Sequence, residues 1–590
     1  MTSAIYTWKR FWCPRVGQLN LSDGGYLCDP DSEYASIYNP DVKNFSEIEK
    51  HPVLGLLGEP GIGKSFAIDQ LVENTKSEIA SEGGHVLHLN LNAIGSETRL
   101  EKKLFGSIEF KTWETQKKPL HIFLDSFDEC LLSIPTLSRF LSEEFKNLTT
   151  HNLFIRIACR THDWPIGLEE FLKANWGKGD VEVYELTPLR RIDVVEAAKI
   201  NGFDPKKFIE EIQNSEVVPF AIKPITLQIL INIFKKESRF PASKSELYRK
   251  GCLSLAEESN KSRRDAKQFG NLSPAQRVIV AARIAALTVF GGKNAIWTGP
   301  VNGEIPDEDL TLASIAGVAD AINGSKIEID ESTLREVLGD TGFFSSRGIY
   351  RTGWAHQTYA EYLAAFYLAH CKANLDQVIS LLSHPEDPGK NLIPQLTEAA
   401  AWVSSINRGV FSHLMRTDPE ALLRGDFSSI NNESKNDLTQ ELLVLYEKGN
   451  AVDSDWALRD HYHKLAHPNL TNQLRPYITD SSKNVIVRRV AIDIAESCNL
   501  TALQEELLAT ALNQSEDYHI RSQATHAICL LGDDKTKQSL KPLAFGQAGY
   551  DPDDELKGQA LRALWPIYIS AEDLFSPLSP PQNENLVVLT

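Results

Sequence analysis

The chain has 590 residues, of which 42% are hydrophobic and 24% are charged, and it carries a net charge of -18. This length predicts about three or four domains, and the acidic balance disfavours a general nucleic-acid-binding surface. The eight cysteines form no C-x-x-C pair, which favours reduced thiols in a cytoplasmic protein over a disulfide framework or a zinc site.

No membrane segment is predicted. The N-terminus places Lys9 and Arg10 among aromatic residues and lacks the apolar stretch of a signal peptide. The most apolar helical run, 278–290, is too short to cross a bilayer and contains Arg283.

Residues 1–45 are rich in aromatic residues and contain the turn signals Gly24-Gly25 and Asp29-Pro30. They predict a small irregular or hairpin segment that packs on the next domain. A second interpretation is a docking site for a separate effector protein.

The most informative stretch follows an apolar strand at 54–57. It matches the P-loop pattern G-x-x-x-x-G-K-[ST], in which glycines let successive backbone amides point toward phosphate oxygens. Lys64 is expected to reach the β and γ phosphates, Ser65 to hold Mg²⁺, and the helix over 65–74 to direct its positive end at the anion. The predicted nucleotide-binding residues here are Gly58, Glu59, Pro60, Gly61, Ile62, Gly63, Lys64, Ser65 and Phe66.

A second apolar strand, 120–125, ends in Asp125, and Asp128 and Glu129 follow one short turn later. An acid at the carboxyl end of a buried parallel strand faces the ligand crevice, which suits Asp125 as a ligand of nucleotide-bound Mg²⁺. Asp128 and Glu129 are the candidates for orienting or deprotonating the attacking water.

Two more strands are predicted over 153–159 and 181–186, after a buried strand at 85–91. Arg160 ends the first of the two and could neutralise transition-state charge, or it could be a surface arginine. Such βα units build a parallel sheet. The lack of an Asn-Lys-x-Asp motif near its end favours adenine over guanine.

A family resemblance rests on several motifs in this region. The segment 123–129 (Phe-Leu-Asp-Ser-Phe-Asp-Glu) resembles the Asp-Gly-x-Asp-Glu form of the Walker B motif in NACHT-type members of the STAND signalling NTPases, except that Ser126 replaces the usual glycine. The segment 221–230 resembles the helix start that follows the family's nucleotide core. The resemblance implies that Pro224 packs against adenine.

The segments 342–344, 350–351 and 354–369 resemble the end of the family's winged-helix domain. In relatives, the histidine that corresponds to His356 contacts the β phosphate of ADP in the resting state. From the residues alone, His356 could equally be a core or capping histidine. The resemblance covers about residues 50–370.

The C-terminal region shows a repeated helical theme, in segments that begin at Val487, Ile520 and Leu556. Their spacing predicts HEAT-like repeats with a concave face for a protein ligand, and an ordinary helical domain is the alternative. The apolar run 585–589 looks like the start of another helix, so we expect the native protein to continue beyond Thr590.

The predicted fold is an α/β P-loop NTPase with a parallel sheet, then a helical and winged-helix lid and an α-solenoid-like region. The expected divisions are 1–45, a nucleotide-binding core over 46–235, the lid over 236–372 and repeats over 373–590. The resemblance implies a slow ATPase switch, idle with ADP, that exchanges to ATP with Mg²⁺ and assembles, for example in antiphage defence. The competing hypotheses are an AAA-like remodelling ATPase and a helical-repeat scaffold with a structural nucleotide. The trigger, the effector and the oligomer size cannot be derived from the sequence.

Overall fold

The structure is a computed structural model of the whole chain. It describes all residues except 1–5, 7, 16, 18, 34, 80–82, 147, 258–271, 301–304, 323–324, 450–455 and 576–590. The chain divides into two compact units, Met1–Lys372 and Ala373–Thr590. Among the residues described, no helix is both long and apolar enough to cross a membrane.

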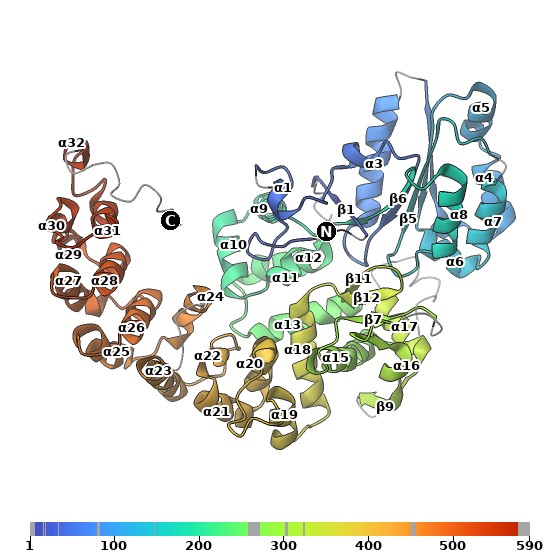
Figure 1. Ribbon diagram of the computed structural model, residues 1–590. Coiled ribbons are helices and arrows are strands. Elements are labelled where there is room, and N and C mark those ends of the chain that lie inside the picture. Colours follow the sequence, from blue (N-terminus) through green and yellow to red (C-terminus); the bar gives the residue numbers. More distant parts are fainter. Residues whose placement is uncertain are drawn as a thin grey trace. The chain divides into compact units, whose positions relative to one another are not determined.

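The first unit is built around a six-stranded sheet with the order β1-β6-β2-β5-β4-β3 (Figure 1). All neighbouring strands are parallel except β1, which pairs antiparallel with β6 at the edge. The predicted α/β core with a mostly parallel sheet is therefore confirmed. The strands are β1 (Trp12–Pro14), β2 (Val53–Leu57), β3 (His85–Asn90), β4 (Leu120–Asp125), β5 (Leu153–Cys159) and β6 (Val181–Leu186).

Apolar residues cover both faces of this sheet, because the alternating side chains of each strand point to opposite sides. In β2, Val53 and Leu57 join the core that the helices α4 to α8 cover, whereas Leu54 and Leu56 join the core under α3. These helices are α3 (Lys64–Ile79), α4 (Glu97–Leu104), α5 (Ile108–Gln116), α6 (Phe127–Ser133), α7 (Leu137–Phe145) and α8 (Ile166–Trp176).

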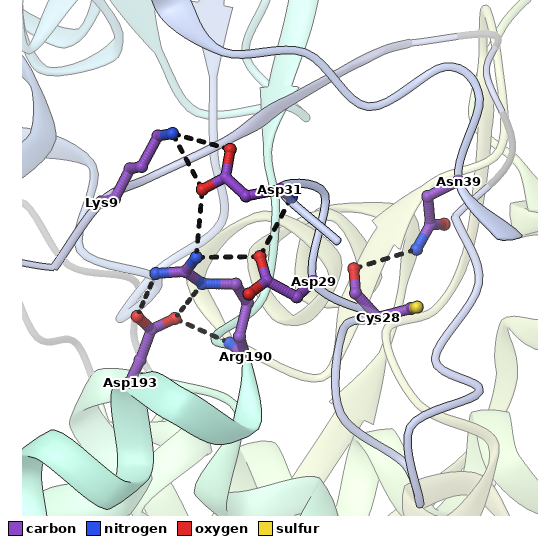
Figure 2. Close-up of polar contacts among 7 residues, drawn as sticks. All are labelled: Lys9, Cys28, Asp29, Asp31, Asn39, Arg190 and Asp193. Atoms are coloured by element: carbon purple, nitrogen blue, oxygen red, sulfur yellow. Dashed lines mark hydrogen bonds and ion pairs between the residues drawn. The ribbon is translucent and has the colours of Figure 1, made fainter. Parts of the chain in front are cut away.

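The N-terminal segment is part of this unit, since it supplies β1 and the short helices α1 (Ala35–Tyr38) and α2 (Phe45–Ile48). Figure 2 shows one of its attachments. The Arg190 guanidinium contacts Asp29, Asp31 and Asp193, and Lys9 contacts Asp31. This chain of charges ties the segment to the start of α9.

The remainder of the first unit is mostly helical and includes a small four-stranded sheet, β11-β12-β7-β8. The predicted helix around 334–338 lies in α17, and the predicted hairpin around 345–348 joins the antiparallel strands β11 and β12. The winged-helix assignment stays a prediction. The strands are β7 (Ala295–Trp297), β8 (Asp309–Thr311), the separate pair β9 (Gly317–Ile322) and β10 (Ser325–Ile329), β11 (Phe344–Ser346) and β12 (Arg351–Trp354).

The helices of this part follow the nucleotide-binding core in chain order. They are α9 (Arg191–Ile200), α10 (Pro205–Asn214), α11 (Val218–Ala221), α12 (Pro224–Glu237), α13 (Lys244–Ala256), α15 (Pro274–Phe290), α16 (Leu312–Ile315), α17 (Glu331–Asp340) and α18 (Gln357–His370).

The described part of the second unit is helical, with no strand. The three repeated segments of the sequence lie in α26, α28 and α31, and α28 packs against both of the others. Repeat packing of the HEAT type stays a prediction, and residues 585–589 lie outside the described residues. The helices are α19 (Leu375–Leu382), α20 (Thr397–Ile406), α21 (Arg408–Thr417), α22 (Pro419–Leu422), α23 (Asn432–Glu447), α24 (Trp456–Arg459), α25 (Leu470–Thr479), α26 (Val485–Ser497), α27 (Gln504–Leu512), α28 (Tyr518–Leu531), α29 (Asp534–Gln538), α30 (Lys541–Ala544), α31 (Glu555–Leu564) and α32 (Ala571–Phe575).

Candidate nucleotide site

Three adjacent strands of the main sheet deliver the predicted site residues to one edge. The strand β2 leads into the glycine-rich loop, β4 ends at Asp125, and β5 lies between them and precedes Arg160. Because parallel strands end at the same edge of a sheet, residues that lie about 100 positions apart in the sequence meet there.

Two positions of the glycine-rich loop have a backbone conformation and surroundings that a residue with a side chain would not fit. Gly61 and Gly63 have φ angles of 77° and 91°, in the left-handed region. A Cβ atom at Gly61 would lie 2.4 Å from Cγ2 of Ile225, and one at Gly63 would lie 3.0 Å from Nη1 of Arg10. The helix α3 begins at Lys64, directly after the loop. The loop and the helix start therefore fit a phosphate-binding element.

The cation and the acids of the predicted site lie close together. Lys64 Nζ is 3.9 Å from Oδ1 of Asp128, and both side chains are mostly buried. Burial raises the pKa of Asp125, and the positive charge of Lys64 partly offsets that rise. Asp128 and Glu129 are buried in the first turn of α6. The structure thus brings Lys64, Asp125 and Asp128 into one cluster.

The described residues contain no group of three or more His, Cys, Asp and Glu side chains that could hold a metal ion by themselves. This is compatible with Mg²⁺, which is usually bound through one or two protein oxygens together with substrate phosphates and water. Ser65 and Asp125 are the residues that would supply those oxygens.

Ser126 stands where the Walker B form that this segment resembles usually has glycine, and its backbone is in a conformation that glycine adopts more readily. It has φ 61° and ψ 41°, which is the left-handed conformation, and its N–H donates to Oδ1 of Asp125 at 2.8 Å. A residue with a Cβ pays about 1–2 kcal/mol in this conformation. The tight turn that aims Asp125 therefore carries backbone strain.

Arg160 is buried, so the surface-arginine interpretation is wrong. Its Nε lies 3.1 Å from Oδ2 of Asp128. Its Nη1 lies 3.4 Å from Oδ1 of Asp340 and donates to the carbonyl of Gly339, at the C-terminal end of α17. A cation is favourable at a helix C-terminus. The Arg160 side chain therefore joins an acid of the nucleotide site to α17, and its contact with phosphate stays a prediction.

Lys223 makes a second connection of this kind. Its Nζ donates to Oε2 of Glu59 at 3.0 Å and to the carbonyl of Gly342 at 2.6 Å. The next residue, Pro224, opens α12, and its Cγ would lie 3.4 Å from a Cβ at Gly63. The structure thus places Pro224 against the glycine-rich loop, and its packing on adenine stays a prediction.

His356 is the N-cap residue of α18, because its Nδ1 accepts a hydrogen bond from the N–H of Thr358. Burial, together with the charge of Lys223, lowers the pKa of His356 to about 4, so the ring is neutral at pH 7. A neutral ring that accepts at Nδ1 carries its proton on Nε2 and can donate there. This fits the predicted hydrogen bond to phosphate but does not test it.

Arg10 is a site residue that the sequence analysis missed. Its Nη1 donates to the carbonyl of Ile62 in the glycine-rich loop at 2.9 Å, and its Nη2 donates to the carbonyl of Thr187 at 2.6 Å. Burial lowers the pKa of Arg10 to about 10. The only sequence signal was a basic residue among aromatic ones at 8–12, which does not reveal a contact 52 residues away.

Comparisons with known proteins add little to this geometry. No family model matches the chain, and no curated protein matches its sequence. Among solved structures, the ORC2 protein of Aeropyrum pernix, in complexes with ADPNP and ADP, is similar at 15% identity and a TM-score of 0.23, over 42% of this chain and 70% of that chain. A TM-score of this size does not establish a shared fold or activity.

The fold and the site define a mixed α/β protein with a mostly parallel sheet, followed by a helical region. A P-loop sequence lies where the strands of the sheet have their carboxyl ends.

Proposed function

We propose that this protein binds and hydrolyses ATP at the glycine-rich loop and acts as a nucleotide-controlled switch of the NACHT-type STAND class. In this account the protein is idle with ADP, and exchange to ATP opens the contacts with α17 and α18 and permits assembly. The C-terminal helices would bind the protein trigger, and the N-terminal segment could bind a separate effector. A role in antiphage defence is part of the same proposal.

The roles of the residues follow from their positions. Lys64 and the loop amides would hold the phosphates, and Asp128 or Glu129 would orient or deprotonate the attacking water. Mg²⁺, when bound by Ser65 and Asp125, neutralises phosphate charge. Arg160 would stabilise the charge that develops in the transition state.

One observation carries the switch proposal. Arg160 contacts Asp128 and Asp340 with the same guanidinium, and all three side chains are largely buried. If a bound phosphate beside Asp128 drew the Arg160 guanidinium toward it, the contact of Arg160 with Asp340 would weaken. The nucleotide state would in this way change the stability of the contact with α17, which is what a switch requires.

The test compares ATP binding and hydrolysis in the wild type, Lys64→Ala, Glu129→Gln and Asp128→Asn. Lys64 would contact charged oxygens, and such bonds are worth about 1.5–3 kcal/mol, so Lys64→Ala should weaken affinity at least tenfold. Glu129→Gln should keep binding but slow hydrolysis. The matched control is Lys76→Ala, on the exposed side of the same helix. Equal ATPase rates in the wild type and all three site variants would refute the assignment.

A remodelling ATPase of the AAA type is the second candidate, because it would use the same loop, acids and arginine. Turnover separates the two. A switch should hydrolyse ATP slowly without its trigger, whereas a remodelling enzyme should turn over steadily. Nucleotide that is retained without hydrolysis under every condition would instead favour a scaffold with a structural nucleotide.

A further inference from the structure

A cavity lies in the first unit, beside the predicted nucleotide-binding loop. It has a volume of about 290 Å³ and is walled by the segment that follows β5, the end of α17 and the β11–β12 hairpin. Glu59 and Pro60, at the tip of the glycine-rich loop, form one side of it. The residues that line it do not include Lys64, Ser65, Asp125 or Asp128. The cavity shares Glu59, Pro60 and Arg160 with the predicted nucleotide site, so it adjoins that site but does not include the residues that would hold Mg²⁺.

Arginines dominate the charge of the lining, with Arg15, Arg160, Arg335 and Arg351 all present. Three of them are neutralised by close carboxylates. Nη2 of Arg15 lies 3.1 Å from Oε2 of Glu169. Arg160 contacts Asp128 and Asp340, and Arg351 donates to both carboxylate oxygens of Asp309, at 2.6 and 2.7 Å.

Arg335 is different. Within the described part of the chain its guanidinium has no carboxylate within ion-pair distance, and it donates from Nη1 and Nη2 to the carbonyl of Thr298 at 3.2 Å. A guanidinium has five N–H donors, so the other three are available to a ligand. Thr298 also lines the cavity, and this contact holds the arginine at its edge.

Other polar groups of the lining also lack partners. In the described structure, Oγ1 of Thr161 and Nε of Arg15 are buried and have no hydrogen-bond partner. Leaving a buried donor unpaired is unfavourable, so such groups usually have a ligand or an ordered water. Glu59, the acid of the lining, is paired with Lys223.

We propose that this cavity is a second ligand site, for a small phosphate-bearing molecule. The planar fork of an arginine matches the geometry of phosphate oxygens, and Arg335 supplies an unneutralised one. The volume is at the lower end for small-molecule sites, which suits a sugar phosphate or free phosphate rather than a nucleoside triphosphate. Because Glu59, Pro60 and Gly339 share its wall, a bound ligand would bridge the glycine-rich loop and α17. The proposal does not depend on ATP hydrolysis.

The test is calorimetric binding of ribose 5-phosphate to the full chain carrying Lys64→Ala, which removes phosphate binding at the glycine-rich loop. Ribose serves as the uncharged control, and inorganic phosphate is titrated separately. We expect saturable binding of ribose 5-phosphate with one ligand per chain, and none of ribose. Inorganic phosphate that binds equally well would identify free phosphate as the ligand, and the site would stand.

Variants then assign the binding to the cavity. Arg335→Ala should weaken ribose 5-phosphate affinity about tenfold, as expected for one charge-assisted contact, and Arg335→Lys should recover only part of it. Thr161→Val should weaken it several-fold. Arg139→Ala, an exposed arginine that pairs only with Glu143 in the described contacts, is the matched control and should bind as before. The same titrations on wild-type protein, followed by intrinsic tryptophan fluorescence with Trp164→Phe to identify the change from the cavity wall, give a readout that does not depend on whether the Lys64→Ala variant folds.

Two results would overturn the proposal. One is the lack of saturable binding of either phosphate probe at millimolar concentration in both backgrounds. The other is binding that Arg335→Ala and Thr161→Val leave unchanged, because the ligand would then lie elsewhere.

Discussion

Nε of Arg160 lies 3.1 Å from Oδ2 of Asp128, while Nη1 of the same guanidinium lies 3.4 Å from Oδ1 of Asp340. Asp128 follows strand β4 of the main sheet. Asp340 is the last residue of α17 and lies 180 residues after Arg160 in the sequence. The arginine therefore links an acid of the candidate nucleotide site to a helix far along the chain.

We predict that Asp340→Asn accelerates release of bound ADP. The change removes the carboxylate that holds Arg160 at α17, and a partly buried charged contact of this kind is worth about 1–2 kcal/mol, or about 5- to 30-fold in an equilibrium. Release is measured by displacement of a fluorescent ADP analogue. Glu331→Gln, in the exposed first turn of the same helix, is the control. An unchanged rate in Asp340→Asn would show that the contact does not restrain the nucleotide.

Ser126→Gly should stabilise the protein, since it replaces a serine in the left-handed backbone conformation with glycine, which adopts this conformation at least cost. The expected gain in unfolding free energy is about 1 kcal/mol. Urea unfolding measures it. Ser142→Gly, in the middle of helix α7, is the opposite control and should destabilise by about 0.5–1 kcal/mol. Equal effects at both positions would contradict the strain at Ser126.

Arg10→Lys should weaken nucleotide binding although it keeps the charge. A lysine cannot donate from two nitrogens to the carbonyls of Ile62 and Thr187, so the glycine-rich loop would lose a support. We expect about a tenfold loss of ATP affinity in a binding titration. Lys9→Ala, which removes a half-exposed neighbour, should have little effect. If both variants bind ATP like the wild type, the loop holds its shape without Arg10.

The parts of this site that the sequence predicts are those whose chemistry is local. The loop ending at Lys64 and the acids that follow β4 are recognisable because glycines, a lysine and carboxylates stand at fixed short spacings. The position of β5 between β2 and β4 was not predicted, because strand order depends on packing.

Two contacts of the site were also missed. The bond from Arg10 to Thr187 spans 177 residues, and that from Arg160 to Asp340 spans 180. Neither pair has a spacing rule that links its members. The sequence showed Ser126 in place of the usual glycine, but the strain there became visible only from its backbone angles.

Acid should destabilise the first unit through His121, whose ring stacks on Phe154 in the main sheet. Burial, and then the charge of Arg156, lowers the pKa of His121 to about 3, below its value of about 6.5 in the unfolded chain. Between these values the unfolded state binds more protons, so stability rises with pH and is lost as pH falls below 6.5.

At pH 5 the expected loss from His121 is about 2 kcal/mol relative to pH 7. The variant His121→Phe keeps a ring at this position but cannot take up the proton. Thermal unfolding at pH 7 and pH 5 should therefore show a smaller drop in the melting temperature for the variant than for the wild type. Identical drops would mean that other groups cause the acid sensitivity.

The most direct test of the switch is the ADP content and particle mass of purified wild type and His356→Leu, each measured with and without ATP. A hydrogen bond from His356 to a charged phosphate would be worth about 1.5–3 kcal/mol, so its loss would change a closed-to-open ratio about 10- to 150-fold. We predict that the wild type retains ADP and keeps its mass, whereas His356→Leu loses ADP and assembles when ATP is added. Pro224→Ala should act in the same direction more weakly. If His356→Leu retains ADP as fully as the wild type and keeps the same mass with ATP, His356 only caps α18 and the switch account is wrong.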